Sequence, residues 1–222
     1  WTRKDGKRAW ARESEIAAGE IGAVDVDGDG TPEMVGRDRK GERLLALNAA
    51  DGRLRWSFAA KVGSWTELRN LSKECKHALT VAEPTRLHLL DPRTGIPAWS
   101  LDLPAPVASQ RHGVDYDADG AQELYVGTQG GQFLAISPAG KELFSAQLDK
   151  PVLEIEPTHV DWDGLRDFVL RVPDGSVAVR APKVIWRRQT DRQVRAQPVL
   201  HDVNGDGVPD AILPILDTGN EW

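Results

Sequence analysis

Short apolar segments separated by turn residues run along the whole chain of 222 residues. In its first part, apolar positions fall into four strand-like segments, at residues 21–25, 33–37, 43–48 and 53–58. The last two segments flank an Asp-Gly pair, which is a strong signal for a β-hairpin. Four short strands within about 45 residues are typical of one blade of a β-propeller.

Two markers recur along the chain with a shared period of about 44 residues. The first is an acidic loop whose aligned glycines stand two, one and one period apart, at Gly30, Gly120, Gly164 and Gly207. The second is an aromatic residue that follows a tight turn, at Trp10, Trp56, Trp99, Phe144 and Trp186. Together they predict five repeats, near residues 13–58, 59–103, 104–148, 149–190, and 191–222 with 1–12.

We therefore predict an all-β fold, a β-propeller of about five four-stranded blades in a single domain, 1–222. The chain stops almost where its first repeat began, so we expect strands from both termini to close the last blade and remove an exposed sheet edge. An arc of a larger propeller is the alternative. A β-sandwich has no reason to repeat a four-strand unit five times. The aromatic residues of the second marker occupy the same position in every repeat, which we call the aromatic register, and we predict that they pack between neighbouring blades.

Composition narrows the classes of partner. The net charge of −6 disfavours a nucleic acid or an anionic membrane held by bulk electrostatics. No apolar run approaches the length of a membrane span, so we expect no membrane insertion. The sequence begins at Trp1 without a signal-like segment, and we interpret it as an excised piece, such as one module of a longer multidomain chain.

The acidic loops carry the candidate chemistry. Each full copy has Asp or Asn at loop positions 1, 3 and 5, Gly at position 6 and an acid at position 9, while residue 7 offers a carbonyl oxygen. Ca²⁺ takes six to eight such oxygens, and carboxylates this close repel one another without a cation. We predict Ca²⁺ at three sets of ligands: Asp25, Asp27, Asp29, Thr31 and Glu33; Asp115, Asp117, Asp119, Ala121 and Glu123; Asp202, Asn204, Asp206, Val208 and Asp210.

Two repeats depart from this pattern. The fourth loop is shortened, so Asp161, Asp163 and Asp167 are weaker metal candidates. In the second repeat, the acidic loop itself is absent from its expected place near Cys75. An EF-hand is rejected because loop position 12 holds no Glu and the flanks resemble strands. Plain acidic turns are the alternative to metal sites, since Asp and Gly favour turns.

The Asp-x-Asp-x-Asp-Gly-x-x-Glu/Asp pattern between two strands resembles the FG-GAP/VCBS repeat of integrin-α-type propellers. Residues 44–56, with Leu-x-Ala-Leu-Asn before an Asp-Gly turn and a Trp, resemble the outer hairpin of PQQ-like propeller repeats. Together the two patterns cover nearly the whole chain. The resemblance implies Ca²⁺ ions that rigidify loops on one face and act structurally. Members of such families typically have more than five blades.

Nothing in the sequence demands catalysis, since it contains neither a Gly-x-Ser-x-Gly elbow nor a phosphate loop. We expect a non-catalytic binding, scaffold or adhesion module for a protein or glycan ligand. The alternative is a carbohydrate-active enzyme, a glycosidase or lyase, with Glu20, Glu154 and Glu156 as candidate acids. Because such loops fill at the millimolar Ca²⁺ found outside cells, we expect an extracellular or periplasmic location.

Overall fold

The computed structural model describes residues 16–69, 71–73, 77–158, 166–180, 183–189, 199–207 and 210–212. The chain divides into two compact units, Trp1–Leu103 and Pro104–Trp222. All regular structure in the described ranges is β-strand, which confirms the predicted all-β class. Those ranges hold no helix with the length and apolar character that a membrane span requires.

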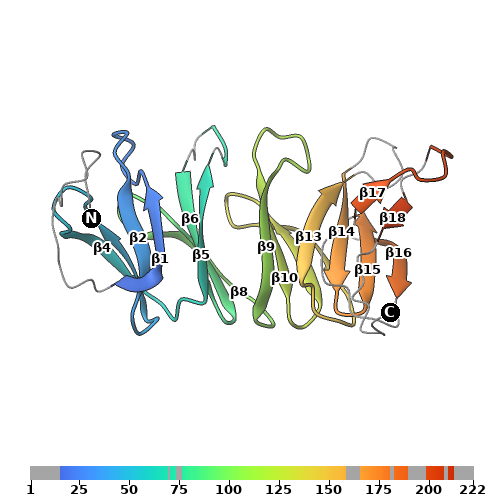
Figure 1. The fold of residues 1–222 in the computed structure, drawn as a ribbon, viewed down its shortest axis with the longest axis horizontal. Helices are drawn as coiled ribbons and strands as arrows, with labels where there is room; N and C mark the ends of the chain where they lie inside the picture. Colours follow the sequence, from blue (N-terminus) through green and yellow to red (C-terminus); the bar gives the residue numbers. More distant parts are fainter. Residues whose placement is uncertain are drawn as a thin grey trace, which may run out of the picture. The chain divides into compact units, whose positions relative to one another are not determined.

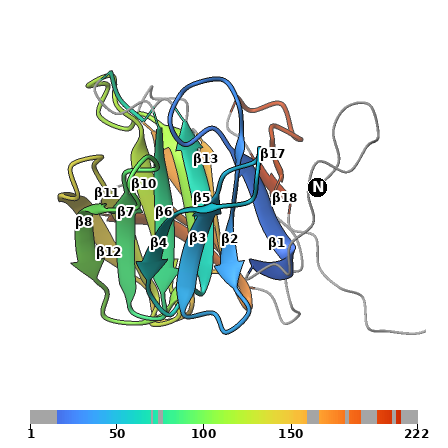
Figure 2. The same cartoon turned by 90° about the vertical axis from the view of Figure 1, so that its left-hand side faces the viewer.

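The first unit contains two four-stranded antiparallel sheets, each formed by strands in sequence order. Figure 2 shows the strands of the first sheet side by side. Its strands are β1 (Ile16–Val24), β2 (Glu33–Asp38), β3 (Arg43–Leu47) and β4 (Leu54–Ala59). The second sheet consists of β5 (Ser64–Arg69), β6 (His77–Glu83), β7 (Arg86–Leu90) and β8 (Pro97–Asp102).

The second unit repeats this arrangement (Figure 1). The third sheet consists of β9 (Val107–Val114), β10 (Glu123–Thr128), β11 (Gln132–Ile136) and β12 (Glu142–Gln147). The fourth consists of β13 (Glu154–Thr158), β14 (Asp167–Val172), β15 (Gly175–Arg180) and β16 (Lys183–Gln189). A separate two-stranded sheet pairs β17 (Val199–His201) with β18 (Asp210–Ile212). Four-stranded meanders in succession are propeller blades, as predicted. The strands predicted at residues 2–12 to close the fifth blade lie outside the described residues.

The middle strands of each sheet form the core, and their sequences explain why. All six residues of β10 are buried, as are Leu44 to Leu47 in β3. These strands are nearly continuous apolar runs, the pattern of a strand that is covered on both faces. The outer strand β4 has one buried side chain, Trp56, among exposed and half-buried neighbours. Each blade therefore buries its centre and exposes its outer strand.

Trp56 joins the two sheets of the first unit. Its indole Nε1 donates a hydrogen bond of 2.8 Å to the carbonyl oxygen of Pro92, in the turn between β7 and β8. Gly95 closes that turn with φ of 69°, and a Cβ there would lie 2.6 Å from the indole ring. Only a residue without a side chain permits this approach. The predicted packing of the aromatic register between blades is therefore confirmed at Trp56.

Phe144 has the same role in the second unit. Its ring lies 5.6 Å from that of Phe133 in its own sheet and 6.0 Å from that of Phe168 in the fourth sheet. Aromatic rings at such centroid distances pack favourably beyond the area that they bury. The side chains of Trp10 and Trp186 lie outside the described part of the chain.

Candidate metal centre

The acidic loops connect the first and second strands of a sheet. In each, the acid predicted at loop position 9 is the first residue of the second strand: Glu33 of β2, Glu123 of β10, Asp167 of β14 and Asp210 of β18. Glu33 and Glu123 are only 3 % and 1 % exposed. The strand thus holds this carboxylate inside the sheet end, while the other acids of the loop stand on the turn.

The first aspartate closes each full turn in the same way, by accepting a hydrogen bond from the glycine N–H at position 6. The N–O distances are 2.9 Å for Gly30 to Asp25, 2.9 Å for Gly120 to Asp115 and 2.8 Å for Gly207 to Asp202. The N–H of Gly207, with that of Gly205, lowers the pKa of Asp202. An aspartate that bonds its own turn is a reason why Asp favours such loops. The three loops therefore share one backbone arrangement.

Positive φ at loop positions 4 and 6 explains the glycines there. Position 4 is Gly28 with φ of 80° in the first sheet and Gly205 with φ of 77° near the C-terminus. The third sheet has Ala118 at this position with φ of 59°, the one non-glycine residue with positive φ in the described ranges. The third-sheet loop thus has the same positive φ at position 4, although this conformation is unfavourable for alanine.

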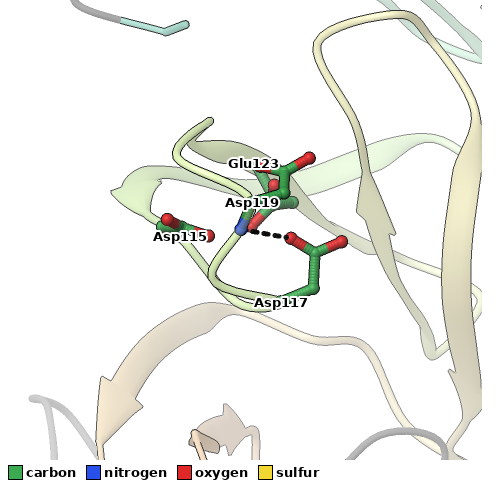
Figure 3. A group of neighbouring side chains, drawn as sticks. All are labelled: Asp115, Asp117, Asp119 and Glu123. Carbon is green, nitrogen blue, oxygen red and sulfur yellow. Dashed lines mark hydrogen bonds between the residues drawn. The ribbon is translucent and has the colours of Figure 1, made fainter.

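The third-sheet loop gathers four carboxylates (Figure 3). Asp115, Asp117, Asp119 and Glu123 each offer an oxygen, and these oxygens all lie within 4.8 Å of one another. The Oε2 atom of Glu123 accepts hydrogen bonds from Tyr116 N at 2.6 Å and from the Tyr125 hydroxyl at 3.3 Å. Its Oε1 and the three aspartates leave further oxygens for a cation. The residue predicted to offer its carbonyl oxygen to the ion in this loop is Ala121. Its backbone N–H donates a hydrogen bond to Asp119 Oδ1 at 2.7 Å.

The electrostatics of this loop favour a cation. Burial raises the pKa of Glu123, and the charges of Asp117, Asp115 and Asp119 raise it further, against the hydrogen bond from Tyr116. The Oδ1 atom of Asp115 is buried and has no hydrogen-bond partner. A bound cation would relieve the repulsion and give this oxygen a partner. An all-oxygen ligand set of this kind suits Ca²⁺, so the residues present fit the predicted ion.

The first-sheet loop differs because an arginine enters it. Asp25, Asp27 and Asp29 have oxygens within 4.8 Å of one another, but Glu33 is not part of this group. Arg55 of β4 donates from Nη2 to Asp27 Oδ2 at 2.5 Å and from Nη1 to Glu33 Oε1 at 2.9 Å. The hydrogen bond from Arg55 lowers the pKa of Asp27.

A guanidinium therefore neutralises two of the predicted ligands of the first loop. The predicted carbonyl donor there, Thr31, donates its N–H to Asp29 Oδ1 at 2.6 Å. Sequence reasoning did not identify the role of Arg55. The available signal was its place one residue before the register aromatic Trp56, where the other described repeats have Ala98, Leu143 and Ile185.

In the fourth sheet an arginine pairs with both carboxylate oxygens of the equivalent acid, Asp167. Asp167 is fully buried, and Arg180 of β15 donates from Nε to its Oδ1 at 2.8 Å and from Nη2 to its Oδ2 at 3.2 Å. Such a two-pronged contact is the strong form of an arginine–carboxylate pair. Asp161 and Asp163, the other weaker candidates, lie outside the described residues.

The two remaining places to consider are the acidic loop near the C-terminus and the equivalent position in the second sheet. Near the C-terminus, Asn204 Nδ2 donates to Asp206 Oδ2 at 3.0 Å, and Asp210 Oδ2 accepts from Val203 N at 3.0 Å. Val208 lies outside the description. In the second sheet, the strand register puts the buried Ala78 where the first sheet has Glu33, so this blade lacks the acid altogether.

Of the acids considered for glycoside hydrolysis, two are described and both lie on β13 in ion pairs. Arg171 Nε lies 2.7 Å from Glu154 Oε2, and Arg111 Nη2 lies 3.9 Å from Glu156 Oε2. The side chain of Glu20 is outside the description. Both glutamates thus lie beside arginines of the second unit.

Comparison with known proteins gives the family and the fold. The family model described as outer membrane protein assembly factor BamB matches residues 1–111 and 83–197. This match supports the PQQ-like part of the predicted resemblance, while the likeness to FG-GAP/VCBS repeats stays a prediction. No curated protein sequence matches the chain.

The solved structures with a similar fold include the following three. BBS1N in complex with ARL6DN has a TM-score of 0.59 and 16 % identity over 82 % of this chain and 60 % of that one. The biofilm matrix protein Bap1 of V. cholerae has a TM-score of 0.56 and 17 % identity, over 78 % of this chain and 29 % of that one. BamB from Moraxella catarrhalis has a TM-score of 0.51 and 17 % identity, over 81 % of this chain and 53 % of that one. At such identities the likeness shows the fold, and this chain spans 29 % to 60 % of the lengths of these proteins.

Proposed function

The chain belongs to the family of the outer membrane protein assembly factor BamB, and from this membership we propose that it is a non-catalytic, protein-binding propeller module of the bacterial cell envelope. The observation that carries the proposal is the match of the family model to residues 1–111 and 83–197, which include all four of its four-stranded sheets. The structure of BBS1N, which has a similar fold, is of a complex with another protein, ARL6DN. Propellers bind through loops on a rigid scaffold, so the same architecture suits a protein partner here.

The proposed location is the periplasm, at the outer membrane that the family name specifies. The net charge of −6 is compatible with a protein partner and with millimolar divalent cations in that compartment. The extracellular alternative, adhesion through a glycan, is the competing outcome of the test below.

We propose further that Ca²⁺ binds the acidic loops as a structural ion, and that the third-sheet loop binds it first. Asp115, Asp117, Asp119 and Glu123 would hold the ion, with the carbonyl of Ala121. When bound, the ion supplies charge neutralisation and rigidity. The equivalent ligands are Asp25, Asp27, Asp29, Thr31 and Glu33 in the first sheet, and Asp202, Asn204, Asp206, Val208 and Asp210 near the C-terminus.

Protein binding is tested by chemical cross-linking in the envelope. The tagged chain is directed to the periplasm of a Gram-negative host, cross-linked in intact cells and purified, and its adducts are identified by mass spectrometry. The proposal expects adducts with proteins that assemble the outer membrane, above those formed by an unrelated periplasmic protein. Adducts no different from that control, together with specific binding on a glycan array, would contradict it and favour the adhesion reading.

A further inference from the structure

The first unit contains a cavity of about 500 Å³ beside its acidic loop. The cavity is lined by residues of the loop between β1 and β2, by Lys73, by the first residues of β6 and by the hairpin of β7 and β8. Its floor is formed by the apolar residues Ala78, Leu89 and Leu90, which also belong to the buried core of the sheet. Ligand sites in proteins commonly have this size and this apolar character.

The walls of the cavity are held in place without a ligand. Trp56 fixes the β7–β8 turn through its hydrogen bond to the Pro92 carbonyl, and the turn closes on itself with Gly95 N donating to Asp91 O at 2.8 Å. On the opposite side, His77 Nδ1 lies 3.3 Å from the Asp25 carbonyl oxygen, so the β6 segment is tied to the acidic loop. A site that is ordered in advance loses less entropy when it binds.

The charges around the cavity are unevenly satisfied. Asp25 accepts hydrogen bonds from three backbone N–H groups of its own loop, and Asp91 Oδ1 accepts one of 2.8 Å from Arg93 N. By contrast, the side chains of Lys73 and Arg93 are exposed and make no hydrogen bond or ion pair with any residue in the described ranges. Arg93 reaches over the acidic loop, since its Nη2 would lie 3.7 Å from a Cβ on Gly28. We call Lys73 and Arg93 the basic rim.

We propose that this cavity binds a short acidic peptide segment of a protein partner. An apolar side chain of the segment would lie on the floor of Ala78, Leu89 and Leu90, and carboxylates flanking it would pair with the basic rim. Because the side chains of Lys73 and Arg93 have no ion-pair partner among the described residues, they are available to attract an anionic group. The inference rests on the proposed protein-binding function, because it names the surface that a partner would occupy.

The test is fluorescence anisotropy of the full chain with a labelled peptide that contains a leucine between two aspartates. Two matched peptides replace both aspartates by asparagine, or the leucine by serine. We expect the acidic peptide to bind at least about tenfold more tightly than either, which is about 1.4 kcal/mol. Equal affinity for the asparagine peptide, or no binding of the acidic peptide at millimolar concentration, would overturn the proposal.

The variants are the double charge reversal Lys73→Glu with Arg93→Glu, its milder form with Ala at both positions, and the control Lys40→Glu, an exposed lysine in the β2–β3 turn. All three should retain the thermal unfolding temperature of the parent chain, because the altered side chains are exposed. Peptide affinity should fall at least about tenfold in the double reversal, fall less in the alanine form and remain unchanged in the control. Unchanged affinity in the double reversal would place the peptide elsewhere and refute the site.

Cross-linking of the double reversal separates this inference from the proposed function. If its envelope adducts match those of the parent chain, protein binding stands and the cavity is refuted as the docking site. If the parent chain itself gives no specific adducts, the proposed function fails independently of the peptide result.

Discussion

The acidic loops of the first and third sheets have the same turn and nearly the same acids, but only the first has an arginine of the chain paired with these acids in the described residues. In the first loop, Arg55 pairs with Asp27 and Glu33. In the third loop, no arginine or lysine pairs with the equivalent acids in the described residues, and Glu123 has a raised pKa. The fourth sheet lies at the other extreme, with Arg180 bound to a fully buried Asp167. An arginine of the chain therefore neutralises the equivalent acid in the first and fourth sheets, and we propose that a Ca²⁺ ion neutralises it in the third.

The comparison also shows why a ligand pattern does not determine metal occupancy. The pattern fixes where the oxygens stand, but the free energy of binding depends on what already neutralises them. A guanidinium close to two ligands must be displaced or must share them, and this weakens the attraction for Ca²⁺. Among the described residues the third-sheet loop has no such competitor, so we expect this loop to bind Ca²⁺ most tightly.

The largest effect is expected for Arg180→Met in the fourth sheet. Removing the guanidinium leaves the buried Asp167 without its partner, which should cost about 3 kcal/mol of unfolding free energy, measured by urea denaturation in EDTA. The control is Arg187→Met, which breaks a more exposed pair with Asp149 and should therefore cost clearly less than Arg180→Met. Equal losses in the two variants would show that Arg180 does not act as an internal cation.

Arg55→Met should make the first loop resemble the third, because it removes the arginine that pairs with Asp27 and Glu33. In EDTA we expect a loss of about 2 kcal/mol, because Glu33 is buried but Arg55 is partly exposed. Adding Ca²⁺ should stabilise this variant more than the parent chain, since the loop is then open to the ion. Arg53→Met, from the exposed pair with Asp51 in the same hairpin, serves as the control. A Ca²⁺ response identical to that of the parent chain would mean that Arg55 does not compete.

The pH dependence of the metal-free chain tests the repulsion in the third loop. The pKa of Glu123 is raised in the folded state, mainly by burial, so the folded state binds its proton more tightly than the unfolded state. Its contribution to stability should therefore be most favourable below its unfolded pKa and should be lost as the pH rises through the raised pKa. Glu123→Gln in EDTA should flatten this part of the stability profile. The exposed Glu142→Gln should not, and a profile unaltered by Glu123→Gln would remove the evidence for repulsion.

The smallest effect concerns the backbone. Ala118 has positive φ where the equivalent loops have Gly28 and Gly205, so Ala118→Gly should stabilise the chain by about 0.5 kcal/mol. Ala121→Gly in the same loop, where φ is not positive, should not stabilise it. Thermal unfolding of both variants checks this difference. Destabilisation by Ala118→Gly would show that the alanine side chain has a packing role that outweighs its strain.

Much of the fold follows from the sequence because it is encoded locally. The Asp-Gly turns, the apolar runs of β3 and β10 and the acidic turn at Asp115 each depend on residues a few positions apart. The register of Trp56 was informative for the same reason, since one aromatic per period indicates one repeated contact.

The features that were missed depend on residues from separate strands. Arg55 reaches Glu33 from β4, and Arg180 reaches Asp167 from β15. The cavity of the first unit needs side chains from two sheets and a turn fixed by Trp56. No spacing rule brings such groups together, so only the tertiary structure reveals which acids are already neutralised and where unpaired cations meet an apolar floor.

The most direct test of the calcium account is isothermal titration calorimetry of the metal-free chain with Ca²⁺, in parallel with Glu123→Gln and Glu33→Gln. These variants change the same loop position in the third and first sheets and keep the side-chain volume. The account predicts that Glu123→Gln abolishes the tightest binding event, while Glu33→Gln leaves it intact. No heat of binding up to millimolar Ca²⁺, or loss of the tightest event in Glu33→Gln alone, would contradict it.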